Sequence, residues 1–376
     1  MRFLYVHIPF CVEKCNYCDF VSAKASSEQR EAYLQLLLKE AELYKSQAPE
    51  DGLLTIFFGG GTPSLLSVQQ LEMLLKGFKN IFGFADSMEI TMEANPETVS
   101  RRYLKMLKRI GINRISFGAQ AFQDHHLRAM GRRHSSEDIV RAVEDAVDVG
   151  FENINIDLMY GLPRQTMAEW QESLRKATEL PVTHISTYGL KLSEETMWGR
   201  WLKEGRLTLP TDDLNADMQL YSMRYLEENG FPRYEIANFA KIGYPCRHNT
   251  AYWIRKDYLG LGLNASSLLN GNVRTRNEAN MEIYRAKVEQ GLFPWAEKEE
   301  LTPKEVMEEE IMLPLRLIWG IDINQFAKKY GTEYFAQKKG QMVKLFDAGL
   351  LTVEEGQLKL TDKGVLLNNE VLSELI

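Results

Sequence analysis

The chain has very few cysteines and no apolar stretch long enough to span a membrane. Four of its 376 residues are Cys, and three of these lie between positions 11 and 18. So few thiols exclude the disulfide framework of a small secreted scaffold, and their grouping favours a metal site in a reducing compartment. The longest apolar runs, such as residues 53–58, have the length of a strand and are far too short for a transmembrane helix.

The chain also lacks an excess of positive charge. It carries 45 Lys and Arg against 52 Asp and Glu, a formal net charge of -7. This balance disfavours nucleic acid as a partner and allows at most peripheral contact with an anionic membrane. We expect no signal peptide, because only a few apolar residues separate Arg2 from Pro9. Together these absences predict a cytoplasmic globular protein.

The three grouped cysteines, Cys11, Cys15 and Cys18, have the spacing C-x3-C-x2-C. Four thiolates would complete a zinc or iron–sulfur site, whereas three leave one metal position open for chemistry. Two other interpretations are a zinc site completed by a distant ligand, such as Cys246 or His7, and a set of buried thiols. The spacing by itself does not decide among the three.

Six units of strand, loop and helix follow one another through the first half of the chain. The predicted strands are residues 4–8, 53–58, 88–93, 114–120, 153–159 and 184–190. The capping box Ser67-x-x-Gln70 predicts the start of one of the intervening helices. This alternation predicts an α/β fold in which a parallel sheet with outer helices forms a partial (β/α)6 barrel. Residues from about 193 to 296 are expected to add helices and irregular strands that close one side of it.

The last part of the chain is predicted to form a smaller domain, dividing the chain into residues 1–296 and 297–376. Its acidic start, 297–310, is expected to be a solvated linker and the beginning of a helix. Further helices are predicted at 321–330, 332–348 and 365–375, with a hairpin at 350–360. This order is typical of a winged helix. The domain is not strongly basic, so we expect it to pack or act as a lid rather than bind DNA.

Residues suited to ligand binding follow the predicted strands. The glycines at 59–61 let the backbone approach a ligand closely, and Glu93, Gln120, Arg132 and Asp157 lie at or just beyond the next strand ends. A zwitterionic ligand with a ribose needs such a set, because Arg binds a carboxylate while acidic and amide groups bind ammonium and hydroxyls. Taken singly, each residue could instead satisfy a local backbone group or an ion pair. Barrels place their sites at the carboxyl ends of the strands, which favours one shared site.

Several segments together resemble the oxygen-independent coproporphyrinogen III oxidase family of the radical SAM superfamily. They are Tyr5-Val-His-Ile-Pro-Phe-Cys11, Cys15-x-Tyr17-Cys18, Phe58-Gly-Gly-Gly-Thr-Pro-Ser64, Glu93-Ala-Asn-Pro96, Ser116-Phe-Gly-Ala-Gln120 and Asp157-Leu-Met-Tyr-Gly-Leu-Pro163. The resemblance implies that the three grouped cysteines hold a [4Fe–4S] cluster, whose fourth iron is chelated by S-adenosylmethionine (SAM). It also implies the SAM-site residues, which are Tyr5, Gly60, Gly61, Thr62, Glu93, Gln120, Arg132 and Asp157.

Within that family, the chain is similar to the heme-chaperone (HemW-type) branch. The decarboxylating dehydrogenases carry a further Cys where this chain has Phe20, and they have an extension ahead of the cluster motif, which starts here at residue 11. The resemblance therefore implies a protein that binds heme and passes it to a recipient hemoprotein. It further suggests an electron donor for the cluster and a homodimer as one candidate assembly. The alternative function is a dehydrogenase that makes protoporphyrinogen IX from coproporphyrinogen III by radical oxidative decarboxylation.

The same branch carries the motif H-N-x-x-Y-W, which is present here from His248 to Trp253. A neutral imidazole is a good axial ligand for heme iron, and flanking aromatic rings can contact a porphyrin. The resemblance thus implies that His248 contacts heme. Without it, a histidine in a loop is more often a hydrogen-bonded structural residue. Cys246, two residues earlier, is interpreted as a buried thiol.

Overall fold

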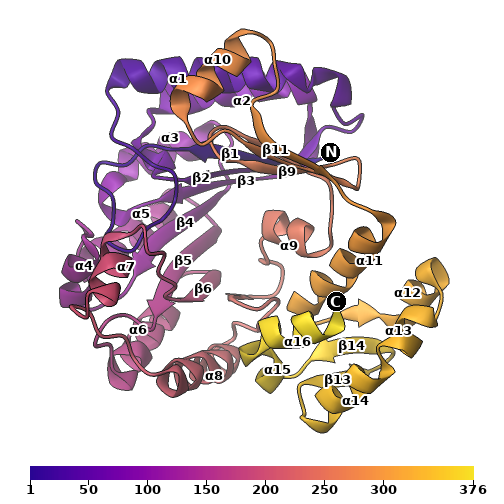
Figure 1. Cartoon of the computed structure of the whole chain (residues 1–376). Helices are drawn as coiled ribbons and strands as arrows, with labels where there is room; N and C mark the ends of the chain where they lie inside the picture. The colour runs from indigo at the N-terminus through magenta and orange to yellow at the C-terminus, as the bar shows by residue number, and fades with distance from the viewer.

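A computed structural model describes residues 1–376. One curved sheet of 11 strands, in the order β11-β10-β9-β8-β1-β2-β3-β4-β5-β6-β7, forms most of the molecule, and a 3-stranded sheet lies near the C-terminus. Figure 1 shows helices α1 to α6 along the outer side of the large sheet. The small sheet and its helices lie beyond the inner, concave side.

All six predicted strand–helix units are present, and β1 to β6 pair in parallel. The strands are β1 (Phe3–Ile8), β2 (Leu53–Gly60), β3 (Phe84–Ala94), β4 (Arg114–Gln120), β5 (Asn153–Tyr160) and β6 (His184–Gly189). The helices between these strands are α1 (Ser27–Leu43), α2 (Val68–Phe82), α3 (Arg101–Arg109), α4 (Asp124–Met130), α5 (Ser136–Asp148) and α6 (Met167–Glu179), with both α4 and α5 between β4 and β5. Short 3₁₀ turns lie at Lys45–Gln47, Pro63–Leu65, Pro96–Thr98 and Pro314–Arg316. The predicted partial barrel is confirmed.

The two sides of the barrel strands have different roles, because successive side chains of a strand point to opposite faces. In β1, Leu4, Val6 and Ile8 are fully buried in the main hydrophobic core, whereas Tyr5 and His7 lie on the other face and line a cavity. The predicted capping box at Ser67 is also present, with Ser67 accepting from the backbone of Gln70. The outer face is therefore used for packing, which leaves the inner face available for a site.

The segments after β6 extend both edges of the sheet, and their role in closing one side of the barrel stays a prediction. β7 (Asn238–Ala240) pairs antiparallel with β6, while β8 (Tyr258–Leu261) pairs in parallel with β1 at the opposite edge. The remaining elements of this region are α7 (Met197–Lys203), α8 (Asp212–Glu228), α9 (Arg247–Trp253), β9 (Ser266–Leu269), β10 (Val273–Asn277) and α10 (Met281–Glu289). Sequence periodicity does not reveal which edge a short strand will join, because pairing over long separations depends on the tertiary fold.

A buried carboxyl group anchors these added strands to the barrel. Glu40 of α1 accepts hydrogen bonds from the backbone of Gly262 at 2.8 Å, from Asn277 Nδ2 at 2.6 Å and from Tyr284 Oη at 2.6 Å. Burial raises the pKa of Glu40 to about 7, although all three donors favour its ionised form. The three hydrogen bonds satisfy a polar group that would be costly to bury alone.

The acidic segment after residue 296 differs from the expected linker. β11 (Trp295–Glu300) is the edge strand of the large sheet, and its acidic side chains are exposed. Charged side chains on an edge strand discourage pairing with other chains. Helix α11 (Pro303–Met312) follows, and its Glu309 accepts from Arg255 at 2.8 Å and Arg274 at 2.7 Å. The division of the chain at residue 297 stays a prediction, and it falls inside this strand.

The C-terminal domain has the predicted small antiparallel sheet and helices. The predicted hairpin is confirmed as β13 (Leu351–Glu354) and β14 (Gln357–Leu360), joined through Glu355 and Gly356 at positive φ. The helix predicted at 332–348 is divided into two at Lys338, and the last predicted helix is divided at Leu367. The remaining elements are β12 (Ile321–Asp322), α12 (Ile323–Tyr330), α13 (Glu333–Gln337), α14 (Lys339–Asp347), α15 (Asp362–Leu366) and α16 (Asn368–Leu375). No helix of the chain has the length and apolar character needed to cross a bilayer.

Candidate functional site

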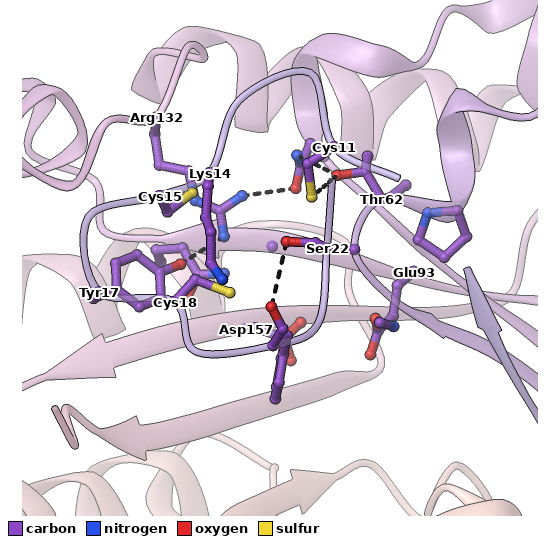
Figure 2. A pocket seen from close by; sticks show the side chains of 18 of the residues that line it. Cys11, Lys14, Cys15, Tyr17, Cys18, Ser22, Thr62, Glu93, Arg132 and Asp157 are labelled. Carbon is purple, nitrogen blue, oxygen red and sulfur yellow. Dashed lines mark hydrogen bonds between the residues drawn. The ribbon is translucent and has the colours of Figure 1, made fainter. Parts of the chain in front are cut away.

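A cavity of about 400 Å³ lies on the inner side of the barrel, between the loop after β1 and the carboxyl ends of β2 to β6. Its lining contains all three grouped cysteines and seven of the nine other predicted site residues, which are Gly60, Gly61, Thr62, Glu93, Gln120, Arg132 and Asp157. Figure 2 shows the cysteine-bearing loop on one side, with Glu93 and Asp157 rising from the strands below it. The fold therefore brings together predicted site residues as far apart along the chain as Cys11 and Asp157.

The loop that carries the cysteines is held by hydrogen bonds at both ends. The Cys18 N–H donates to the Cys15 carbonyl at 3.2 Å, and the backbone N–H of Asn16 donates to the Met130 carbonyl at 3.0 Å. Thr62 Oγ1 donates to Cys11 Sγ at 3.6 Å. Burial raises the pKa values of the Cys15 and Cys18 thiols. All three cysteines line the cavity, as a metal site with one position open to a ligand requires.

Neither distant residue considered as a fourth ligand reaches these thiols. Cys246 is fully buried elsewhere, and its Sγ donates to Glu89 Oε1 at 3.6 Å. Both ring nitrogens of His7 are already engaged, with Tyr5 Oη at 3.1 Å and the Val21 carbonyl at 2.9 Å. This geometry disfavours a zinc site closed by Cys246 or His7. The donor set instead fits a metal centre held by three thiolates.

Arg132 provides a half-buried cationic group beside the cysteine loop. Its guanidinium donates to Asn95 Oδ1 at 2.7 Å and to Tyr17 Oη at 2.8 Å, and its Nε is buried without a hydrogen-bond partner. The charge of Arg132 favours the Cys15 thiolate, although burial is the larger influence on that pKa. A buried donor without a partner is costly. The geometry therefore suits an anionic group of a ligand, such as a carboxylate.

Two half-buried carboxyl groups, Glu93 and Asp157, lie across the cavity from Arg132. Burial raises the pKa of Glu93 to about 8, with a further increase from the charge of Asp157. Glu93 Oε2 accepts from the Gly60 N–H at 3.2 Å. Burial also raises the pKa of Asp157, even though Ser116 and Asn155 donate to it at 3.1 and 2.8 Å. Carboxyls in such surroundings would be stabilised as anions by a cationic ligand.

The backbone around the cavity is unusual at two positions. Gly60 has φ of 109°, and Gln120, a residue with a side chain, has φ of 66°. Gln120 adopts this left-handed conformation where the pairing of β4 with β5 is irregular. Strain of this kind tends to gather at ligand sites. At Gly118, a Cβ would lie 2.9 Å from Gln120 Nε2, so the glycine makes room for that side chain.

Tyr5 and His248, the two other predicted site residues, do not line this cavity. Tyr5 borders a second cavity of about 610 Å³, which also contains Tyr252, Trp253 and Tyr258. Phe20 lines both cavities and is 60% exposed. The walls of the second cavity are mostly hydrophobic and include five aromatic rings, and Arg274 is its one arginine.

His248 lies behind the aromatic wall of the second cavity. It is 1% exposed, and its ring lies 5.3 Å from that of Phe57. Its Nδ1 is 2.7 Å from Thr55 Oγ1, and its Nε2 is 2.7 Å from Tyr252 Oη. Burial lowers the pKa of His248 to about 3, so the ring is neutral. Because both ring nitrogens have partners, this geometry favours a structural role, and the predicted heme contact stays a prediction.

Some residues around the two cavities were not singled out from the sequence. In the first cavity these are Tyr17, Asn95 and Tyr188; in the second, Tyr258 and Arg274. Tyr17 and Asn95 lie inside segments that carry the family resemblance, which could have marked them. Arg274 and Tyr258 lie on β10 and β8, and no local pattern distinguishes them from ordinary strand residues.

Family models and known relatives match this chain along its length. The model for the radical SAM superfamily matches residues 5–177, and that for the HemN C-terminal domain matches residues 301–367. The heme chaperone HemW of Bacillus subtilis is 37% identical over 377 residues, covering 100% of this chain and 99% of the relative. That of Lactococcus lactis is 36% identical and covers 99% of this chain and 96% of the relative.

The fold itself matches a solved structure of coproporphyrinogen III oxidase (HemN) from Escherichia coli. The TM-score is 0.87 at 24% identity, and the match covers 99% of this chain and 89% of that one. At this identity the likeness establishes the shared fold. With the full-length relatives above, it shows that the chain belongs to the radical SAM superfamily and, within it, to the HemW family.

Proposed function

We propose that this protein is a cytoplasmic heme chaperone, which binds a [4Fe–4S] cluster and SAM in the first cavity and heme in the second. It would then pass the heme to a recipient hemoprotein. The observation that carries this proposal is the contact between the two cavities at Phe20, which both of them share. Membership of the HemW family supports the same function.

In the first cavity, Cys11, Cys15 and Cys18 would hold the cluster. When bound and reduced, such a cluster supplies the electron for cleavage of SAM. Arg132 would bind the carboxylate of SAM through its free Nε, and Glu93 would accept from the amino group. Gly60 and Gly61 let the backbone approach the ligand, and the inner face of the barrel limits its contact with water.

The pKa of Glu93 predicts a pH-dependent affinity for SAM. Because the raised pKa of about 8 leaves this carboxyl mostly protonated at neutral pH, Glu93 must lose its proton before it can accept from the amino group of SAM. The affinity should therefore increase with pH below about 8, by up to about tenfold per unit, and then level off. The measurement is the Kd of SAM between about pH 6 and pH 9 on the cluster-loaded protein.

The control for this prediction is Glu93→Gln, whose side-chain oxygen still accepts from Gly60. This variant should show a flatter dependence on pH. Equal slopes in the parent and the variant would show that Glu93 is not the group that titrates.

The second cavity has the size and lining expected of a porphyrin site. Its volume is about 610 Å³, and aromatic rings from Tyr5, Tyr252, Trp253 and Tyr258 line it. Pockets that bind such ligands are mostly apolar, with a few placed polar groups. Arg274 would pair with a heme propionate, although it also pairs with Glu309 at 2.7 Å. The heme would thus lie beside the SAM cavity.

Phe20 provides the test of this heme site. Its exposed ring should contact heme, so Phe20→Ala should weaken heme binding by about tenfold through loss of apolar contact. Heme titration of the cluster-loaded protein, followed by absorbance, measures this. The matched control is Ile242→Ala, because Ile242 is 93% exposed and lies outside both cavities. Equal heme affinity in Phe20→Ala and the parent would contradict the proposed site.

The alternative function, a coproporphyrinogen III dehydrogenase, is favoured only by the shared fold. Phe20 stands where the resemblance places a further Cys in those enzymes. An anaerobic assay with reductant, SAM and coproporphyrinogen III separates the two functions. Formation of protoporphyrinogen by the cluster-loaded chain would establish the dehydrogenase and reject the chaperone as its sole function.

A further inference from the structure

Two adjacent histidines and a glutamate converge outside both cavities, between helices α4 and α6. His125 Nε2 lies 3.1 Å from Glu169 Oε1, and His126 Nε2 lies 3.5 Å from Glu169 Oε2. The two imidazole rings are 4.1 Å apart between centroids. One ligand atom from each residue lies within 4.8 Å of the others. None of the three residues lines the first or the second cavity.

His126 has an unsatisfied nitrogen that faces this group. Its side chain is only 5% exposed, and its Nε2 is buried without a hydrogen-bond partner. His134, another histidine near a glutamate, has partners for both of its ring nitrogens. His134 uses one nitrogen for Glu97 at 3.2 Å and the other for the Ala119 carbonyl at 3.1 Å. An ordinary His–Glu pair therefore satisfies its histidine, whereas the group at α4 and α6 leaves one buried nitrogen available.

The surrounding structure holds the three side chains in place. Glu169 Oε2 accepts from the backbone N–H and the hydroxyl of Thr166, both at 2.8 Å, which leaves Oε1 facing His125. Gln123, just before α4, donates through Nε2 to the Glu169 carbonyl and to Glu172, each at 3.0 Å. These bonds tie the start of α4 to α6. The glutamate is thus oriented by groups that a bound ion would not displace.

We propose that His125, His126 and Glu169 bind a divalent transition-metal cation of the zinc class. Two imidazoles and one carboxylate are a donor set that zinc accepts, with water in the fourth position. Tetrahedral bonds of about 2.0–2.1 Å place ligand atoms about 3.3 Å apart. The ligand atoms of the three residues lie within 4.8 Å of one another. Because the side chain of His125 is exposed, it can move the small distance that brings its nitrogen to the ion. The ion would satisfy the free nitrogen of His126 and join α4 to α6.

The experiment titrates ZnCl2 into the cluster-loaded protein, since empty cysteines would themselves bind zinc. Calorimetry should give one zinc per chain. His125→Asn, His126→Asn and Glu169→Gln should each weaken binding by at least about tenfold, while Glu179→Gln, at the far end of the same helix and exposed, should bind like the parent. Zinc should also raise the thermal midpoint of the parent and of Glu179→Gln, and not that of the ligand variants.

His125→Asn is the decisive variant, because His125 is 59% exposed and its replacement is not expected to disturb folding. Zinc bound with the parent's affinity and stoichiometry in His125→Asn would overturn the proposal. So would an absence of zinc binding by the parent at concentrations well above those of weak surface sites. Visible absorbance of the cluster, recorded throughout, confirms that zinc has not replaced iron.

Discussion

Replacing Cys11, Cys15 or Cys18 by Ala should abolish the iron–sulfur cluster. Each variant should retain less than about a tenth of the parent's iron and sulfide, because two thiolates do not hold a cluster that needs three protein ligands. The three cysteines line one cavity, and neither Cys246 nor His7 is placed to substitute for a lost ligand. Iron and sulfide per chain, measured after anaerobic reconstitution, provide the readout.

Cys246→Ser is the matched control for these variants. It removes the fourth thiol of the chain, which is buried beside Glu89 and lies outside the cavity. Its iron content should equal that of the parent. Full iron and sulfide in any variant of the three grouped cysteines would reject the cluster site. Loss of iron in Cys246→Ser with an unchanged circular dichroism spectrum would also require a different ligand set.

Arg132→Met should weaken SAM binding by about tenfold to a hundredfold. A hydrogen bond to a charged group contributes about 1.5–3 kcal/mol, and the substitution removes the one that Nε would make to the SAM carboxylate. The buried Nε without a partner is the group that a ligand carboxylate would engage. The Kd of SAM for cluster-loaded protein, measured by equilibrium dialysis, tests this expectation.

Arg133→Met provides the comparison, since Arg133 is the adjacent residue and its side chain is exposed. It should bind SAM like the parent. Arg132 also donates to Tyr17 in the cysteine loop at 2.8 Å, so the iron content of both variants must be measured first. A normal SAM affinity in Arg132→Met at full cluster content would show that another residue holds the carboxylate.

Most residues that line the first cavity could be predicted, because the carboxyl ends of the parallel strands in a barrel lie together on one side. Gly60, Glu93, Gln120 and Asp157 each lie near the end of a different parallel strand, and such ends meet at one edge of the sheet. The side-chain types were sufficient to predict a ligand site there. Their hydrogen-bond partners, such as Asn95 for Arg132, depend on distances between strands that the sequence does not contain.

The outcomes for Tyr5 and His248 were not predictable in the same way. Tyr5 belongs to the same short segment as Cys11, yet its side chain borders the second cavity. His248 lies in a recognisable motif, but the fold surrounds it with Thr55, Phe57 and Tyr252. Whether a histidine is free to bind a ligand depends on its neighbours from other elements, and local sequence does not reveal them.

The sequence by itself determined the six strand–helix units, the three cysteines that leave one metal position open, and the family to which the chain belongs. These are local patterns of spacing and residue type, and they are set by covalent order and by the periods of helix and strand. Only the tertiary structure decided that later segments extend both edges of the sheet and that Phe20 lines both cavities. It alone brought His125 and His126 to Glu169. Such contacts join residues far apart along the chain, and they form only when burial of the whole core selects one arrangement.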